Sequence, residues 1–180
     1  VNYMVPGVVA LILTIVTMTM TATAIVKEKE RGTIEQLTVS PVRPLELILG
    51  KAIPYALIGY ADVLVVVAVG LLWFQVPIAG SFFLLLALSG LYILTTLGLG
   101  LLISTVSQTQ QQAMMLGFFA NPPFMLLSGF IFPIASMPEP MQLFTYLIPL
   151  RYFLVVIRGI FLKGVGLDVL WPQAAALLAI

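Results

Sequence analysis

The residues of this sequence that could do chemistry are few, and many of them lie in one short stretch. Residues 26–44 read VKEKERGTIEQLTVSPVRP and hold four basic and three acidic side chains, seven of the chain's fifteen charged residues. The sequence contains no cysteine and no histidine. It therefore offers no thiolate nucleophile, no disulfide and none of the usual zinc or copper ligands. We expect neither a catalytic residue nor a metal site, and we ask what the charged stretch could bind.

The second half of this stretch carries the signals of a short helix. Thr33 and Gln36 have the spacing of a capping box, in which each side chain bonds to the backbone amide of the other residue. Gly32, directly before them, permits a sharp bend. The segment TIEQLTVS then predicts a helix of about two turns that ends before Pro41.

Two interpretations of the charged stretch are open. A basic loop can act as a topology signal that keeps one side of a membrane protein in the cytoplasm. A topology signal needs only bases, however, whereas this stretch also contains Glu28, Glu30 and Glu35. The predicted helix also has an apolar face of its own, with Ile34 and Leu37 three residues apart. A docking surface for another protein explains these features better.

The elements that must position this stretch are predicted to be membrane-spanning helices. Hydrophobic residues make up 61% of the chain and charged residues 8%, against about 25% charged in a soluble domain. Several apolar runs have about the 20 residues that cross a bilayer. We predict an all-α polytopic membrane bundle, a single domain over residues 1–180 with about five spans. The predicted spans are 4–26, 45–74, 82–103, 113–132 and 167–180.

Three features within the spans carry local predictions. TMTMTATA at 17–24 alternates like a strand, but a lone strand in lipid leaves its backbone unpaired, so we expect a helix whose threonine hydroxyls bond to carbonyls one turn earlier. Gly90, Gly98 and Gly100 should allow close contact between helices. The sequence NPP at 121–123 should interrupt the fourth span.

Residues 138–164 fit a span poorly. Arg151 and Arg158 would lie near its middle, where each costs about 2.5–3.5 kcal/mol on insertion scales. We predict two short external helices at the membrane interface, anchored by Tyr146 and Tyr152. The two arginines could bind lipid phosphate or steer a substrate, or they could simply extend to the interface.

The distribution of bases predicts the orientation. One side has five of them and the other has three: Lys27, Lys29, Arg31, Arg43 and Lys51 against Arg151, Arg158 and Lys163. The positive-inside rule then places the loop at 27–44 in the cytoplasm, with the spans in the plasma membrane, which in a bacterium is the inner membrane. The net charge of +1 gives no reason to expect a nucleic-acid partner.

Two polar residues inside the spans are candidates for a translocation path. Asp62 is the only charge in the middle of the second span, and acids at such depth usually face the bundle interior. It could be a cation or proton site, or a carboxyl that is protonated or hydrogen-bonded to a neighbouring helix. Asn121 could line the same path, or could belong to a structural kink with Pro122 and Pro123.

Two motifs resemble a known family. EKERGTIEQLTVSPVRPLELILGK is similar to the cytoplasmic loop of ABC type-2 exporter permeases, in the subgroup associated with multidrug efflux. PPFMLLSGFIFPIASMP followed by IPLRYFLVVIRGIFLKG is similar to the external re-entrant region of the same family. The likeness extends from about residue 4 to residue 173. Because such permeases normally have six spans, the resemblance implies a fragment that lacks the first span and any external domain after it.

The resemblance also implies what the charged stretch binds. In that family the corresponding segment is a coupling helix seated in a groove of the nucleotide-binding subunit. Matched residue by residue, the contact would comprise Glu28, Lys29, Glu30, Arg31, Gly32, Thr33, Glu35 and Gln36. Closure of the ATPase would push the loop, provided that the loop binds the open and closed ATPase differently. The expected partners are this ATPase, a second permease copy or a similar permease, and membrane lipids.

The chain itself shows no nucleotide site. Gly50-Lys51 is the nearest approach to a phosphate-binding loop, but Leu45 stands where the motif needs glycine and Ala52 where it needs serine or threonine. ATP and Mg²⁺ are therefore expected in the partner, and the chain is expected to be a transport permease rather than an enzyme. The expected cargo is a hydrophobic or amphipathic compound. The alternatives are an ion-coupled secondary transporter that uses Asp62 and a structural membrane subunit that transports nothing.

Overall fold

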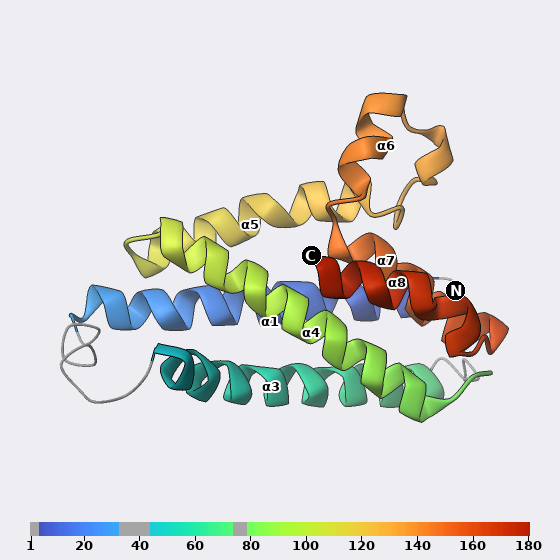
Figure 1. The fold of residues 1–180 in the computed structure, drawn as a ribbon, viewed down its shortest axis with the longest axis horizontal. Coiled ribbons are helices and arrows are strands. Elements are labelled where there is room, and N and C mark those ends of the chain that lie inside the picture. The colour runs from blue at the N-terminus through green and yellow to red at the C-terminus, as the bar shows by residue number, and fades with distance from the viewer. Residues whose placement is uncertain (1–3, 33–43, 74–78) are drawn as a thin grey trace.

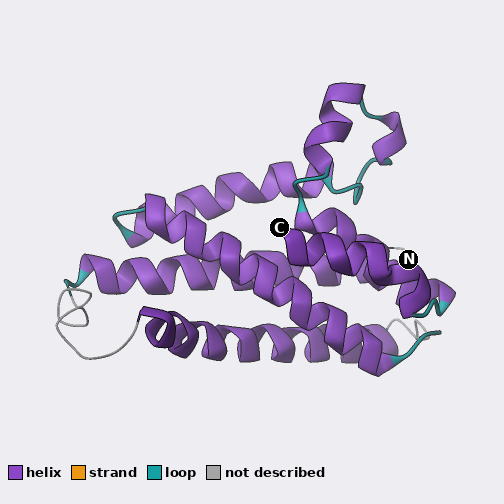
Figure 2. Cartoon of the chain, viewed as in Figure 1, coloured by secondary structure: helices purple, strands orange, loops and turns teal. Residues whose placement is uncertain are grey.

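The computed structural model of the chain describes residues 4–32, 44–73 and 79–180. Over these residues it consists of helices and connecting loops, with no strand (Figure 2). The long helices are α1 (Met4–Glu30), α3 (Pro44–Leu72), α4 (Phe82–Val106) and α5 (Gln110–Leu127). The shorter ones are the 3-10 helix η1 (Ile134–Ser136), α6 (Glu139–Thr145), α7 (Pro149–Arg158), the π-helix η2 (Gly159–Lys163) and α8 (Leu167–Ala179).

The described helices form a membrane bundle, as predicted. Three of them, α1, α3 and α4, are long and apolar enough to cross a membrane. A fourth span results if α6 and the continuous α7–η2 helix, which meet at a bend of 79°, are counted together. Helix α5 begins with three glutamines, and α8 has 13 residues. The all-helical membrane fold is confirmed, in rough agreement with about five spans.

Helix α1 is the centre of the bundle and contacts α3, α4, α5 and α7 (Figure 1). Its C-terminal end lies at the same end of the bundle as the start of α3 and the turn between α4 and α5 (left in Figure 1). The start of α1, the end of α3, the start of α4 and helix α6 lie at the opposite end. Successive long helices are therefore antiparallel, as short connections between spans require.

The core between α1 and α4 is partly polar. Tyr92 of α4 is completely buried, and its hydroxyl hydrogen-bonds with the Thr14 hydroxyl of α1. One turn further along α1, the hydroxyls of Thr17 and Thr96 of α4 are hydrogen-bonded over 2.8 Å. The Tyr92 ring stacks on Phe153 of α7, with ring centroids 4.1 Å apart. Lipid tails are as apolar as leucine, so such hydrogen bonds distinguish a protein neighbour from lipid.

The alternating stretch 17–24 is helical, and two of its hydroxyls bond to the preceding turn, whereas the buried Thr21 hydroxyl has no partner among the described residues. Thr17 donates to the carbonyl of Leu13 over 2.6 Å, and Thr23 donates to the carbonyl of Thr19 over 2.8 Å. The predicted bonds to the preceding turn are therefore confirmed at these two positions. The absence of water in a bilayer explains why the helix overrides the strand-like pattern.

Two of the three glycines of α4 lie at close helix contacts. A side chain at Gly90 would overlap the hydroxyl of Tyr60 on α3, and a Cβ at Gly100 would lie 2.8 Å from the carbonyl oxygen of Met18 on α1. The prediction of close contact is confirmed for Gly90 and Gly100 but is wrong for Gly98, whose added Cβ meets no atom of the described residues within 4 Å.

The interruption expected at residues 121–123 is absent, because α5 continues through Pro122 and Pro123 to Leu127. Each proline lacks an N–H and so frees a carbonyl one turn earlier. In the same turn the Asn121 side-chain amide donates to the carbonyl of Gly117 over 2.8 Å, which adds a bond parallel to the helix axis. The helix is thereby reinforced next to the two prolines.

The two short helices predicted within 138–164 are present, but only one is peripheral. Helix α6 projects from the bundle (top right in Figure 1), with Thr145 as its one buried residue. Helix α7 packs into the core through Phe153, Leu154 and Ile157. The placement of the two helices at the membrane interface stays a prediction, although α7 packs against the bundle rather than projecting from it. The arginines allow this because the bend puts Arg151 in the first turn of α7 and Arg158 in its last.

Candidate functional site

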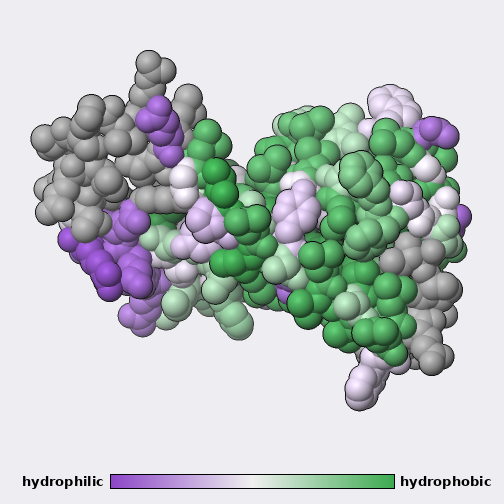
Figure 3. Space-filling view, turned by 90° about the horizontal axis from the view of Figure 1, so that it is seen from below, coloured by the Kyte–Doolittle hydropathy of each residue, from purple (hydrophilic) through white to green (hydrophobic). Residues whose placement is uncertain are grey.

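The charged end of the bundle is formed by the last turn of α1 and the residues that follow it. The predicted span ended at Val26, whereas α1 continues to Glu30, so the first residues assigned to the loop at 27–44 are helical. A dense group of hydrophilic side chains lies at this end in Figure 3, with a few more at the opposite end, and the face between them is largely apolar. Gly32 has a φ of 71°, a left-handed conformation that favours glycine, and it turns the chain away from the helix.

The structure describes five of the eight residues predicted to contact an ATPase. They are Glu28, Lys29, Glu30, Arg31 and Gly32, and all lie at this end, with Glu28 half-buried and the other four exposed. Thr33, Glu35 and Gln36, together with the predicted capping box and coupling helix, lie outside the described residues.

Lys29 and Glu30 bind the turn between α4 and α5. The Lys29 ammonium donates to the carbonyl of Ser107 over 3.0 Å. The Glu30 carboxylate accepts from the side-chain amide of Gln110 over 2.9 Å and from its backbone N–H over 3.3 Å. Two neighbouring residues of α1 thus hold the two ends of one turn, about 80 residues away in the sequence.

The charges of these two residues match the helix ends that they bind. Ser107 caps the C-terminus of α4, where unpaired carbonyls create partial negative charge, and Lys29 is a cation. Gln110 is the first residue of α5, where free N–H groups create partial positive charge, and Glu30 is an anion. Because α5 has no acidic residue in its own first turn, α1 supplies the negative charge.

The turn itself holds a variant of the capping box that the sequence interpretation missed, in which the returning bond goes to Gln108, the residue before the cap. The Thr109 hydroxyl accepts from the backbone N–H of Gln112 over 3.2 Å, and the Gln112 side chain accepts from the backbone N–H of Gln108 over 2.9 Å. The signal was present, because Thr109 and Gln112 have the same spacing that was recognised at residues 33 and 36.

Small residues extend the contact between α1 and α5 into the bundle. Ala22 and Val26 of α1 and Ala113 of α5 are fully buried in one cluster. One turn further, a Cβ added at Gly117 of α5 would lie 3.4 Å from the hydroxyl of Thr19 on α1. The polar contacts of Lys29 and Glu30 thus end a continuous, closely packed contact between the two helices.

The two candidate residues for a translocation path are not brought together. Asp62 lies on α3 and Asn121 on α5, and these helices flank α1 in Figure 1. Asp62 is half-buried, and its Oδ2 atom has no hydrogen-bond partner among the described residues. Asn121 uses its amide within α5. Their assignment to a path stays a prediction.

Arg151 lies at the corner between α6 and α7 rather than facing solvent freely. Its guanidinium lies 4.1 Å from the centre of the Tyr146 ring and donates to the hydroxyl of Thr145. The Tyr152 hydroxyl donates to the carbonyl of Tyr146 over 2.9 Å across the same corner. Arg158 is half-buried near α1, with a guanidinium nitrogen 3.6 Å from a Cβ added at Gly7. A role of either arginine toward lipid or substrate stays a prediction.

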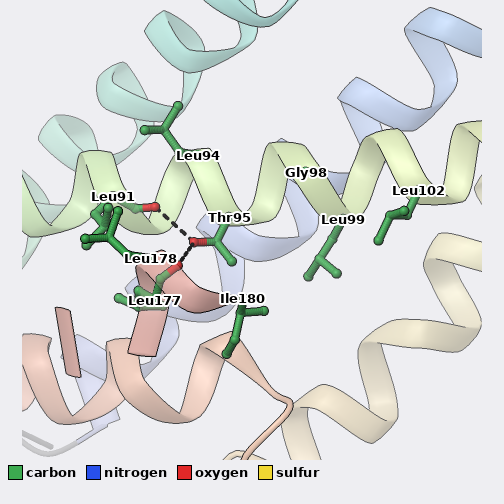
Figure 4. Close-up of a pocket in the computed structure, with 9 residues that line it drawn as sticks. All are labelled: Leu91, Leu94, Thr95, Gly98, Leu99, Leu102, Leu177, Leu178 and Ile180. Atoms are coloured by element: carbon green, nitrogen blue, oxygen red, sulfur yellow. Dashed lines mark hydrogen bonds between the residues drawn. The ribbon is translucent and has the colours of Figure 1, made fainter. Parts of the chain in front are cut away.

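Two apolar grooves open on the described surface. The first, about 390 Å³, lies between α4 and α8, where the Thr95 hydroxyl donates to the carbonyls of Leu91 and Leu177 (Figure 4). It includes Gly98, the glycine without a close neighbour. The second, about 580 Å³, lies between the end of α5 and the start of α6 and is lined by Pro122, Phe132 and Met141 among others.

Long apolar helices with charged side chains near their ends define a multi-pass membrane protein. A comparison with known families places it further: the chain belongs to the ABC-2 type transporter family, whose model matches residues 1–162. The predicted resemblance to ABC type-2 permeases is thereby confirmed.

Curated relatives of the chain are named as transporters, and the bacterial ones as permeases. It is 37% identical to the probable multidrug ABC transporter permease YbhR of Escherichia coli K12, over 99% of this chain and 48% of that protein. It is 38% identical to the probable multidrug ABC transporter permease YbhS of the same organism, over 91% and 44%. It is 28% identical to ABC transporter G family member 20 of Dictyostelium discoideum, over 93% and 23%. The chain spans about half the length of the bacterial relatives.

Proposed function

We propose that this chain is the membrane part of a permease that exports a hydrophobic or amphipathic compound from the cytoplasm, driven by ATP hydrolysis in a separate subunit. The observation that carries the proposal is the charged end, where α1 leaves the apolar bundle and turns at Gly32. Its mixed charges fit a protein partner better than a topology signal. The multidrug transport in the names of the relatives supports the cargo class.

The proposed ATPase contact comprises the eight residues predicted from the sequence, with two roles among them. Glu28, Arg31, Gly32 and the segment after it are proposed to face the ATPase. Lys29 and Glu30 bind the α4–α5 turn, so they are assigned to bracing the contact. In this proposal ATP and Mg²⁺ are bound by the partner, and the charged end faces the cytoplasm from a plasma membrane.

A translocation path is proposed between two permease copies, or between this permease and a similar one. Helix α5 supports this, because Met115, Phe118 and Phe119 on it are exposed. The groove at its far end, lined by Pro122 and Met141, supports an apolar cargo, since its volume lies within the range of about 300–1,000 Å³ of ligand pockets.

A single cysteine tests the ATPase contact. These 180 residues contain no cysteine, so Ile34→Cys adds a unique thiol to them. In inside-out vesicles holding the full-length protein, we expect a membrane-impermeant thiol reagent to label residue 34, and the ATPase subunit to block the labelling. Labelling that ignores the ATPase would reduce the charged end to a topology signal. Labelling only from the opposite side would reverse the orientation.

One observation favours a second candidate, an ion-coupled secondary transporter. The Oδ2 atom of Asp62 is buried without a hydrogen-bond partner in the described part of the chain, as a cation or proton site would be. Proteoliposomes separate the two functions. Uptake of a hydrophobic fluorescent dye that needs ATP and persists with a proton ionophore supports the exporter. Uptake that the ionophore and Asp62→Asn each abolish supports the secondary transporter.

A further inference from the structure

We propose that Glu30, together with Lys29, is a positioning residue that transmits movement of the segment after Gly32 to helix α5. The inference rests on the proposed function, because the ATPase supplies the movement. It goes beyond that function by naming the contact through which the movement leaves α1.

Glu30 lies where helix α1 ends. It is the last residue of the helix, and Gly32, with its left-handed φ of 71°, follows two residues later. Arg31 and Gly32 are still bonded to the last turn of the helix, since their backbone N–H groups donate to the carbonyls of Lys27 and Lys29 over 3.1 and 3.2 Å. A displacement of the following segment therefore reaches the last turn of α1 directly.

The last turn of α1 binds the ends of two other helices. The Glu30 carboxylate accepts two hydrogen bonds from Gln110, the first residue of α5, and the Lys29 ammonium donates to the carbonyl of Ser107, which caps α4. Each bond joins a charged group to a helix end of opposite partial charge. A movement of the last turn of α1 therefore acts on the N-terminus of α5.

The contact between α1 and α5 continues from the charged end into the bundle. Beyond Glu30, the two helices pack through Val26 against Ala113 and through Thr19 against Gly117. Contacts between small residues bring helix backbones close and leave little room for independent sliding. Helix α5 is also widely exposed, with Met114, Met115 and Phe118 all more than half accessible, so its position depends on α1 and on the turn.

The contacts of Glu30 point to transmission rather than direct docking. Both hydrogen bonds from Gln110 end on its Oε2 atom and hold the carboxylate on the start of α5. Removal of Glu30 is therefore expected to change how α5 responds while the ATPase still binds. A contact residue would show the reverse order of effects.

The experiment uses two single-cysteine reporters in the full-length protein, with cysteines outside these residues replaced. Ile34→Cys reports ATPase binding through protection from a thiol reagent. Met115→Cys, on the exposed face of α5, reports the helix through the difference in labelling rate between nucleotide-free and vanadate-trapped states. Both are combined with Glu30→Ala, which removes the hydrogen-bond acceptor and keeps a good helix former.

A charge-matched control and a rescue complete the design. Val106→Lys adds the same unit of positive charge at the same end, on an exposed residue at the C-terminus of α4, where a cation is favourable. The pair Glu30→Gln with Gln110→Glu exchanges donor and acceptor and returns a negative charge to the start of α5.

We expect Glu30→Ala to reduce the nucleotide-dependent change at residue 115 several-fold, with protection of residue 34 retained. The control should leave both reporters unchanged, and the exchanged pair should restore the response. A full response in Glu30→Ala, a lost protection of residue 34, or an exchanged pair that restores nothing would each overturn the inference. Absence of protection in the parent protein would instead contradict the proposed ATPase partner, before any Glu30 variant is made.

Discussion

Charged side chains hold two corners of this molecule, at opposite ends of the bundle. At the charged end, Lys29 and Glu30 reach from α1 to a turn far away in the sequence, and both are exposed. At the α6–α7 corner, Arg151 contacts Tyr146 and Thr145, its near neighbours in the chain, and is half-buried. The first corner joins separate helices, whereas the second fixes one local bend.

The difference concerns how readily each corner can change. Exposed charge contacts are weak and are screened by salt, because water and ions compete for both partners. A guanidinium held between a ring and a buried hydroxyl is shielded from that competition. The molecule therefore has an adjustable end, where a partner is proposed to act, and an end built to stay fixed.

Loss of the Arg151 contacts with Tyr146 and Thr145 should have the largest effect on stability. Arg151→Ala removes a cation–π contact and a charged hydrogen bond, so we expect the free energy of unfolding to fall by about 2 kcal/mol. Reversible unfolding of the full-length protein in mixed detergent micelles measures this. Arg151→Lys keeps the charge without the planar group and should recover only part of the loss. An unchanged stability in Arg151→Ala would show that the corner is held by α7 packing alone.

Removal of the cap at the charged end should have a smaller effect. Thr109→Ala deletes the acceptor for the Gln112 N–H, which typically costs about 1 kcal/mol of helix stability. We expect faster amide hydrogen exchange over the first turn of α5, with exchange in α7 unchanged. Thr109→Ser keeps the hydroxyl and serves as the control. Equal exchange in both variants would mean that Glu30 alone sustains the helix start.

Salt should produce the smallest effect and should separate the two corners most directly. At about 1 M salt the screening length falls to roughly 3 Å, so the contacts of Glu30 and Lys29 should weaken while those of Arg151 persist. Amide hydrogen exchange at low and high salt measures both corners in one sample. Exchange should rise around Gln110 and stay constant around Tyr146. A parallel rise at both places would contradict the comparison.

The helical fold was predictable because a bilayer leaves a spanning segment few alternatives. The spans follow from the length of the apolar runs, and the helix over residues 17–24 follows from the absence of water in the bilayer. The family follows from two sequence motifs. The burial of α7 was not predictable, since two arginines in one apolar run seem too costly until the 79° bend places them at opposite ends of a short helix. No sequence pattern encodes that angle.

The sequence predicted which segment forms the site, but it did not predict which residues that segment contacts. The charged stretch and the bend at Gly32 are visible in the sequence, and so is the capping box at Thr109, although it was overlooked. The contact between Glu30 and Gln110 is different, because it depends on where two helix ends meet after three antiparallel spans have packed. Opposite partial charges at the ends of α4 and α5 explain the contact once it is seen.

The paired hydroxyls between α1 and α4 have a consequence for biogenesis. Helix α4 enters the membrane after α3 and must then find α1 among competing lipid and helix surfaces. A slip of one turn could re-form only one of the two pairs, and it would leave one hydroxyl of each helix without its partner on the other helix, with no water to replace it. Only the native alignment pairs all four hydroxyls, so the pairs favour the correct register during assembly.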